Sequence, residues 1–171
     1  MRPQPNVPVA TTFTSAPLRN RLRLHLNQPV EAVWSLVGDL SRLPEYSAGL
    51  ERVDSKTDSG GACTEYTCHF KSRAAGEAGI VDRNVVRWYE PNVGYASSAQ
   101  ADNAFGVTND LNLLTVEPSG EGMIVTWDEH YEAADVPMMR AEYDGAFADI
   151  ADRLISRFGG HVIERTVDGL R

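Results

Sequence analysis

The chain is poor in cysteine, with only Cys63 and Cys68 among its 171 residues. The two lie an odd number of positions apart in one predicted strand, so their side chains are expected on opposite faces of that strand. Thiols placed in this way neither pair with each other nor share a metal ion. We therefore expect two reduced thiols, one of them buried, as is usual in a cytoplasmic protein.

Long apolar runs and basic clusters are also missing. No apolar segment reaches the roughly 18 residues that a membrane-spanning helix requires, and residues 1–17 carry four prolines but no stretch suited to a secretory signal. The net charge of −8 disfavours nucleic acid and anionic membranes as partners. These absences predict a cytoplasmic protein that binds neither nucleic acid nor a membrane.

Motifs of the common cofactor-dependent enzymes are absent as well. The sequence contains no G-x-S-x-G, no phosphate-binding loop and no dinucleotide fingerprint. Its histidines fall on different predicted elements and are not expected to converge, so we expect no metal site and no cofactor. They are His25, His69, His130 and His161.

Alternating apolar and polar residues predict a series of strands. The segment "RNRLRLHLN" over 19–27 alternates strictly, which is typical of a half-buried strand. A helical stripe from Val30 to Val37 ends at Gly38, and "SRLPEY" over 41–46 supplies a second short helix or a tight loop. From Gly49 onward, the turns "DSGG", "EPNVG" and "PSGEG" punctuate six further strands.

A long amphipathic helix follows over 137–158, capped by Gly159 and Gly160. One helix must cover the apolar face of a seven-stranded antiparallel sheet, and it cannot fill the concavity of a strongly curved one. We predict an α+β fold in which the sheet grips this helix around an internal cavity, with the two short helices closing one end. The predicted boundaries are a flexible tail over 1–17, one domain over 18–160 and a C-terminal tail over 161–171.

Three segments in this order carry a resemblance to a known family. They are "LNQPVEAVWSLVGDLSRLPEY" after the first predicted strand, "EPSGEGMIVTWDEHYE" in the last hairpin, and the C-terminal helix. Together they span about residues 18–160 and resemble the START/polyketide-cyclase superfamily (SRPBCC), whose fold is called helix-grip. Its members include aromatase/cyclases, lipid carriers, hormone receptors and folding cofactors, and the chain looks most similar to the aromatase/cyclases.

Resemblance to the aromatase/cyclases implies cofactor-free aldol ring closure and loss of water from a poly-β-ketone held in the cavity. In those enzymes an inward arginine stabilises the developing enolate, and Arg87 lies near the corresponding position. Arg83 shares its predicted strand face. In the other register of this strand, Asp82, Asn84 and Trp88 point inward instead, and Asp82 is then a rival acid or base.

The last predicted hairpin places an acid on an apolar wall. If its turn centres on Ser119, the face that is apolar near the turn is the inner one. Glu129 on this face would have its pKa raised by desolvation and could exchange protons near neutral pH. The alternative is a Glu129 that lies in water at the cavity mouth or pairs with an arginine. The facing pairs on the inner side are Leu111 with Trp127 and Asn109 with Glu129, followed by Tyr131.

An aromatic and thioether set completes the expected lining, and a flat hydrophobic ligand would stack on it. The alternative is that these side chains simply fill a core. They are Tyr66, Phe70, Trp127, Met139, Tyr143 and Phe147.

Two functions remain open from the sequence. The first is a cofactor-free cyclase or dehydratase, in which Arg87 stabilises an enolate, Glu129 moves protons, and Tyr131 and Asn109 orient carbonyls. The second is a carrier or sensor of a hydrophobic small molecule. In both, the partner is a hydrophobic small molecule, with a polyketide-like ligand as one candidate, and the protein is a monomer or a homodimer.

Overall fold

The computed structural model describes residues 5–166. Within this range the helices and strands follow the predicted order, with a short 3-10 helix added at the start and one strand added at the end. In chain order they are η1 (Ala10–Thr12), β1 (Leu18–Leu26), α1 (Val30–Val37), η2 (Leu40–Glu45), β2 (Leu50–Thr57), β3 (Cys63–Phe70), β4 (Val81–Glu90), β5 (Gly94–Ala99), β6 (Val107–Ser119), β7 (Gly122–Ala133), α2 (Val136–Phe158) and β8 (Gly160–Thr166).

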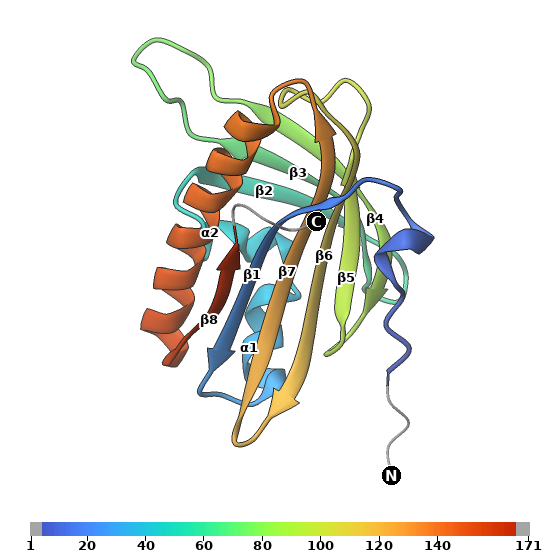
Figure 1. The fold of residues 1–171 in the computed structure, drawn as a ribbon, viewed down its shortest axis with the longest axis vertical. Coiled ribbons are helices and arrows are strands. Elements are labelled where there is room, and N and C mark those ends of the chain that lie inside the picture. Colours follow the sequence, from blue (N-terminus) through green and yellow to red (C-terminus); the bar gives the residue numbers. More distant parts are fainter. Residues whose placement is uncertain (1–4, 167–171) are drawn as a thin grey trace.

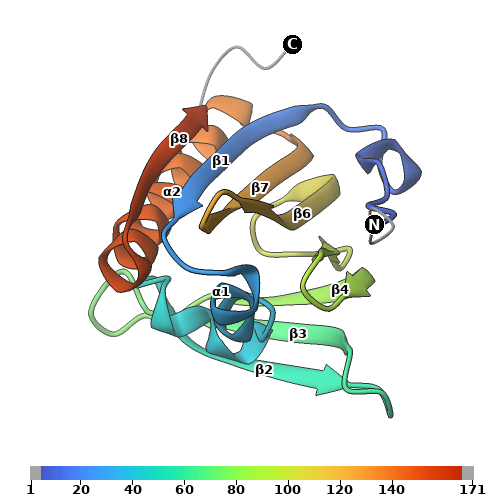
Figure 2. The ribbon, with the colours of Figure 1, turned by 90° about the horizontal axis from the view of Figure 1, so that it is seen from below.

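One antiparallel sheet forms the frame, with the strand order β2-β3-β4-β5-β6-β7-β1-β8. It curves strongly, and from below the strands trace an arc around an interior (Figure 2). Helix α2 packs along β7, β1 and β8, on one side of that arc (Figure 1). The predicted α+β helix-grip architecture is therefore confirmed, with eight strands in the described part of the chain instead of seven.

The additional strand corrects the predicted C-terminal tail. Residues 160–166 form β8, which pairs antiparallel with β1; residues 167–171 lie outside the described part. Gly159 and Gly160 have φ angles of 71° and 126°, which are accessible to glycine and let the chain reverse directly after α2. The β-branched Val162, Ile163 and Thr166 are the strand signal that sequence reasoning overlooked.

The predicted N-terminal tail is also not wholly free. Ala10 and Phe13 pack against a small apolar cluster on the outer face of the sheet, which contains Ala96, Leu111 and Leu113. Figure 1 shows this segment beside β4 and β5. From residue 10 onward, the predicted tail therefore covers the outside of the strands whose inner faces surround the interior.

The break between the two short helices closes the end of the interior. Helix α1 ends at Gly38, where a Cβ atom would lie 2.3 Å from the Trp34 ring. Asp39 then caps η2 by accepting a hydrogen bond from the Ser41 backbone N–H at 3.1 Å. The Tyr89 hydroxyl donates to the Gly38 carbonyl at 2.9 Å and ties the corner to β4. Viewed from below, α1 lies across the open end of the arc (Figure 2).

Bulges in three strands change which side chains point inward. The β2–β3 register shifts at Thr64, and the β4–β5 register shifts at Arg87. A third shift lies between Thr108 and Leu111 in β6. Each bulge inserts one residue and reverses the alternation beyond it. The shift at Thr64 corrects the cysteine prediction, because it turns both thiols inward, and both are buried.

Two glycines test the chain reversal after α2. A Cβ on Gly160 would lie 1.9 Å from the His25 carbonyl oxygen, whereas a Cβ on Gly145, inside α2, would meet no atom within 4 Å. We expect Gly160→Ala to lower the free energy of unfolding by about 2 kcal/mol or more, and Gly145→Ala to raise it by about 0.5 kcal/mol. Urea denaturation measures both, and equal effects would contradict the described reversal.

Candidate ligand-binding cavity

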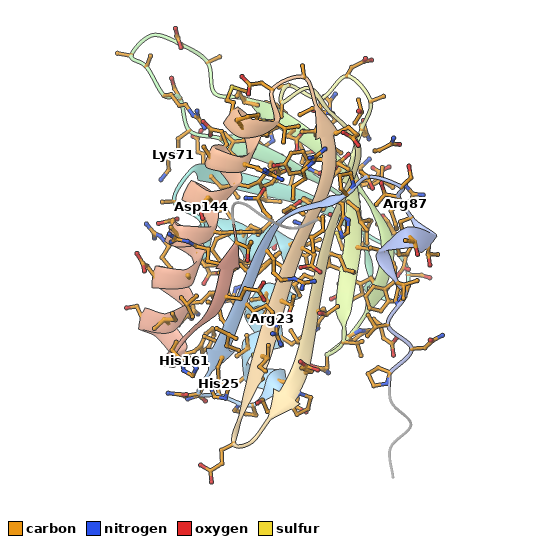
Figure 3. The ribbon with its side chains drawn as sticks, in the orientation of Figure 1. Arg23, His25, Lys71, Arg87, Asp144 and His161 are labelled. Atoms are coloured by element: carbon orange, nitrogen blue, oxygen red, sulfur yellow. The ribbon has the colours of Figure 1, made fainter. Side chains whose placement is uncertain are left out.

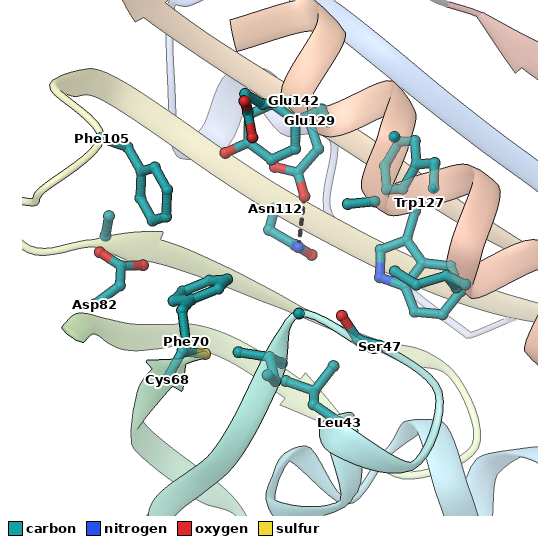
Figure 4. A pocket seen from close by; sticks show the side chains of 18 of the residues that line it. Leu43, Ser47, Cys68, Phe70, Asp82, Phe105, Asn112, Trp127, Glu129 and Glu142 are labelled. Atoms are coloured by element: carbon teal, nitrogen blue, oxygen red, sulfur yellow. Dashed lines mark hydrogen bonds between the residues drawn. The ribbon is translucent and has the colours of Figure 1, made fainter. Parts of the chain in front are cut away.

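A cavity of about 810 Å³ lies between the concave face of the sheet and α2 (Figure 4). It is lined from β3 to β7, from the N-terminal half of α2 and from the turn between η2 and β2. This volume is in the range of small-molecule sites, roughly 300–1,000 Å³. The predicted internal cavity is therefore present, and its walls decide what it can hold.

The apolar part of the lining is mainly aromatic. All of the predicted set from Tyr66 to Phe147 line the cavity. Phe70 meets Phe105 edge to face at 5.3 Å between ring centroids, and the Tyr143 ring stacks on Tyr131 at 5.0 Å. Phe105, in the loop before β6, carries no alternation signal and was not predicted. A flat apolar ligand body would contact rings on several sides.

Glu129 lies in this cavity and is 5% exposed. The Asn112 side-chain amide donates to its Oε1 at 2.7 Å, the contact drawn in Figure 4. Burial raises the pKa of Glu129 well above its usual range, and the nearby charges of Asp110 and Asp128 raise it further. These surroundings therefore favour the protonated carboxylic acid over the carboxylate.

Two aspartates that were not among the candidate site residues also line the cavity. Asp82 is nine-tenths buried on β4, and the Asn84 side-chain amide donates to its Oδ2 at 3.1 Å. Asp110 on β6 accepts a hydrogen bond from the Ala99 backbone N–H at 2.8 Å. Burial raises the pKa of both, and raises that of Asp110 to about 6. Asp82 had been considered only as the rival of Arg87.

Strand pairing places these groups close together on the concave face. Asn84 pairs with Ala99 on β5, next to Asp110. Two residues along β5, Ser97 pairs with Asn112, which pairs with Glu129. Neighbouring strands lie about 4.8 Å apart, so the groups occupy adjacent levels of the concave face. We call this set the polar stripe. It consists of Asp82, Asn84, Asp110, Asn112 and Glu129.

Arg83 and Arg87 are not in the cavity, and their predicted placement is wrong. Both are exposed on the outer face of β4, while Asp82 and Asn84 point inward. Figure 3 shows Arg87 beside the N-terminal segment, and its guanidinium lies 6.0 Å from the centroid of the Phe13 ring. The alternative register of this strand therefore holds for its first half. The bulge at Arg87 reverses the alternation, so Trp88 joins the outer cluster.

Asn109 and Leu111 are also misplaced by the prediction. The hairpin turns at Gly120 and Glu121, not at Ser119, so Asn112 stands opposite Glu129. Gly120 has a φ of 59°, as a two-residue hairpin turn requires. Asn109 is exposed in the bulge, with a φ of 49°. Leu111 is buried on the outer face, under the N-terminal segment.

Tyr131 faces inward but stands behind the cavity wall. Its hydroxyl donates to Asn20 Oδ1 at 2.8 Å, and both residues are fully buried. Tyr143 lies over its ring and lines the cavity in its place. The contacts of Tyr131 are therefore those of a structural residue.

The cavity opens beside the loop between β3 and β4. Arg73 in this loop donates to Glu142 on α2 at 2.6 Å, with 71% and 41% of the two side chains exposed. On the opposite side, the Ala48 backbone N–H donates to Asp149 at 2.7 Å and joins the η2–β2 turn to α2. These contacts link α2 to the loops on both sides of the entrance.

Metal ligands do not gather in the described part of the chain. Across residues 5–166 no three His, Cys, Asp or Glu side chains are placed to hold a metal ion. Two histidines that were expected to lie apart do meet: His25 and His161 stack at 5.3 Å across β1 and β8 (Figure 3). No helix in this range is long and apolar enough to cross a membrane.

The fold and the cavity together define a START-like helix-grip protein. A START superfamily protein from Mycobacterium smegmatis superposes with a TM-score of 0.66 at 14% identity, covering 81% of this chain and 94% of that chain. The protein XoxI from Bacillus cereus gives 0.65 at 20% identity, covering 82% and 95%. A conserved protein from Geobacillus kaustophilus gives 0.63 at 16% identity, covering 84% and 97%.

Residues 21–159 match the family described as polyketide cyclase / dehydrase and lipid transport, and the chain belongs to this family. No match was found among curated proteins.

The hydroxyl of Tyr131 provides a test of its structural role. Tyr131→Phe removes the hydroxyl that donates a hydrogen bond to Asn20 Oδ1. We expect the free energy of unfolding to fall by about 1–3 kcal/mol, because Asn20 Oδ1 would stay buried without that donor. Ligand binding and turnover should be unchanged. If Tyr131→Phe were as stable as the wild type but had impaired turnover, Tyr131 would have a catalytic role and not a structural one.

The raised pKa of Asp110 predicts a pH dependence of stability. In the unfolded chain this carboxyl ionises near pH 3.8, and in the folded protein at about 6. Between these values the folded state holds a proton that the unfolded state has lost, so rising pH lowers the free energy of unfolding. Between about pH 4 and about pH 7.5, the free energy of unfolding should fall more in the wild type than in Asp110→Asn. After allowance for solvent screening, we expect this difference to be roughly 1–2 kcal/mol.

Chemical denaturation of both proteins across this range measures the difference. Asp152→Asn, which changes an exposed aspartate on α2, is the control and should follow the wild type. Parallel curves for the wild type and Asp110→Asn would contradict the raised pKa.

Proposed function

We propose that the protein binds a hydrophobic, carbonyl-bearing small molecule in the cavity and promotes its cyclisation or dehydration by proton transfer, without a cofactor. Membership of the polyketide cyclase / dehydrase and lipid transport family supports this class of ligand and reaction. The observation that carries the proposal is Glu129, a buried acid held by Asn112 on the wall of an aromatic cavity.

The stripe offers an acid and a base with different proton affinities. Burial favours the protonated form of Glu129, whereas Asp110, with a pKa of about 6, is mostly ionised at neutral pH. Carboxyls whose surroundings separate their pKa values in this way suit the two roles of acid and base. In a dehydration, Asp110 would remove the proton next to the carbonyl, and Glu129 would give its proton to the departing hydroxyl, which leaves as water.

The position of the arginines changes how an enolate would be stabilised. Arg83 and Arg87 lie on the outer face of β4, so neither reaches a ligand in the cavity. Arg73 at the entrance is paired with Glu142, so stabilisation would come from neutral donors, among them Glu129 in its protonated form. Such a donor stabilises a growing negative charge by a hydrogen bond from a site shielded from water.

Glu129→Gln tests this function once a substrate is in hand. Native mass spectrometry of the purified protein identifies molecules that stay bound, and these define the substrate for a turnover assay. We expect Glu129→Gln to bind this substrate as the wild type does, and to turn it over roughly a hundredfold more slowly, because it lacks the transferable proton.

The matched control is Glu132→Gln, on the same strand but exposed and paired with Arg19; its turnover should equal that of the wild type. If the molecule that stays bound is never converted, or Glu129→Gln converts it at the normal rate, proton transfer by Glu129 is refuted. The former outcome would favour a carrier, a role that the family description also includes.

A further inference from the structure

We infer that the ligand carries a positively charged amine, and that Asp82 is the counter-ion of this amine inside the cavity. The inference rests on the proposed function in one respect only: the cavity must bind a hydrophobic small molecule. It adds the chemical class of that molecule, and it assigns Asp82 a part in binding that is separate from proton transfer at Glu129.

The charged groups of the cavity wall are almost all acidic. Asp82, Asp110 and Glu129 lie along the concave face, and Glu142 and Asp149 lie on α2. The only cation among the lining residues is Arg73, which is 71% exposed and already paired with Glu142 at 2.6 Å. A carboxylate ligand would therefore meet like charge inside the cavity, whereas a cation would meet opposite charge.

Two fully buried polar atoms of the lining lack a partner, and both are acceptors. Asp82 Oδ1 and Asn112 Oδ1 are buried and have no hydrogen-bond partner. Such atoms cost free energy unless a donor reaches them. A ligand carbonyl has no proton to give them. An ammonium group has up to three N–H donors and a charge that matches the carboxylate.

The surroundings of Asp82 favour an organic cation. Asn84 satisfies only its Oδ2, and the rings of Phe70 and Phe105 lie beside it in the cavity (Figure 4). Aromatic faces attract a cation that has left water. The neighbouring Arg83 is exposed on the outer face and supplies no counter-charge within the cavity.

A metal ion or a neutral hydroxyl fits these observations less well. No three potential ligands within residues 5–166 are placed to hold a metal, because the carboxyls are spread over several strands. A phenol or an alcohol would satisfy an acceptor but would leave the charge of Asp82 uncompensated. An amine attached to a flat apolar body would donate hydrogen bonds to the polar stripe and would stack on the aromatic side chains of the cavity.

A matched series of probes tests the charge preference directly. Naphthylethylamine, naphthylethanol and naphthylacetic acid share one ring system and differ in the charge of the end group. Isothermal titration at about pH 7.5 and low salt should show the amine binding the wild type at least about tenfold more tightly than the alcohol, with the acid weakest.

Asp82→Asn keeps the size of the side chain and an acceptor for Asn84. We expect it to bind the alcohol as the wild type does and to bind the amine no more tightly than the alcohol. Glu142→Gln, at the entrance, is the control for general attraction of cations and should keep the preference for the amine. Thermal unfolding of each variant checks that it is folded.

The outcomes show whether the inference alone fails or whether the proposed function fails with it. Equal binding of amine and alcohol to the wild type overturns the amine class but leaves a cavity for hydrophobic molecules. A preference that survives in Asp82→Asn overturns the role of Asp82. If none of the three probes binds, both the inference and the proposed function fail.

Discussion

Helix α2 packs along β7, β1 and β8, and only the short helices α1 and η2 contact β6 and β3, so much of the concave face from β3 to β6 has no helix packed on it. An uncovered sheet face inside a fold must be filled by side chains or by a ligand. Here the side chains fill it only in part, and a cavity of about 810 Å³ remains. The closed lower end, the entrance beside the β3–β4 loop and the line of acids across the strands are all consequences of this incomplete cover.

Regular alternation makes much of this arrangement predictable from the sequence. Periodicity alone predicts the apolar face of α2. It also predicts that Trp127 and Glu129 point inward and that Asp128 points outward. The structure shows all of these orientations. The predictions fail at bulges and at one turn. Arg87 was expected inside from the resemblance, and Asn109 from a hairpin turn centred on Ser119. A register error of an odd number of residues moves a side chain to the other face. A bulge depends on how a strand pairs with its neighbour, so it cannot be predicted from the sequence of that strand alone.

The same reversal of faces changes the chemistry of the cavity. With Arg83 and Arg87 inside, the wall would suit an anion or an enolate. With Asp82 and Asn84 inside, it offers carboxyl groups and hydrogen-bond acceptors instead. The chain thus has the helix-grip fold and belongs to the polyketide cyclase / dehydrase and lipid transport family, but the charge of its cavity wall is opposite to the one that the resemblance implied. Family membership alone does not fix the ligand, since function resides in the site and not in the fold.

Buried acids also couple ligand binding to stability. Burial raises the pKa values of Asp82, Asp110 and Glu129, so the empty folded protein is less stable at neutral pH than it would be with neutral residues in their place. A donor ligand that pairs with Asp82 removes part of this cost, and it can do so only in the folded state, where the stripe is assembled. Binding must therefore stabilise the fold by mass action. The acids that lower the stability of the unliganded protein are then the same groups that select its ligand. Replacing them with neutral residues would raise the stability but remove the preference for a cationic ligand.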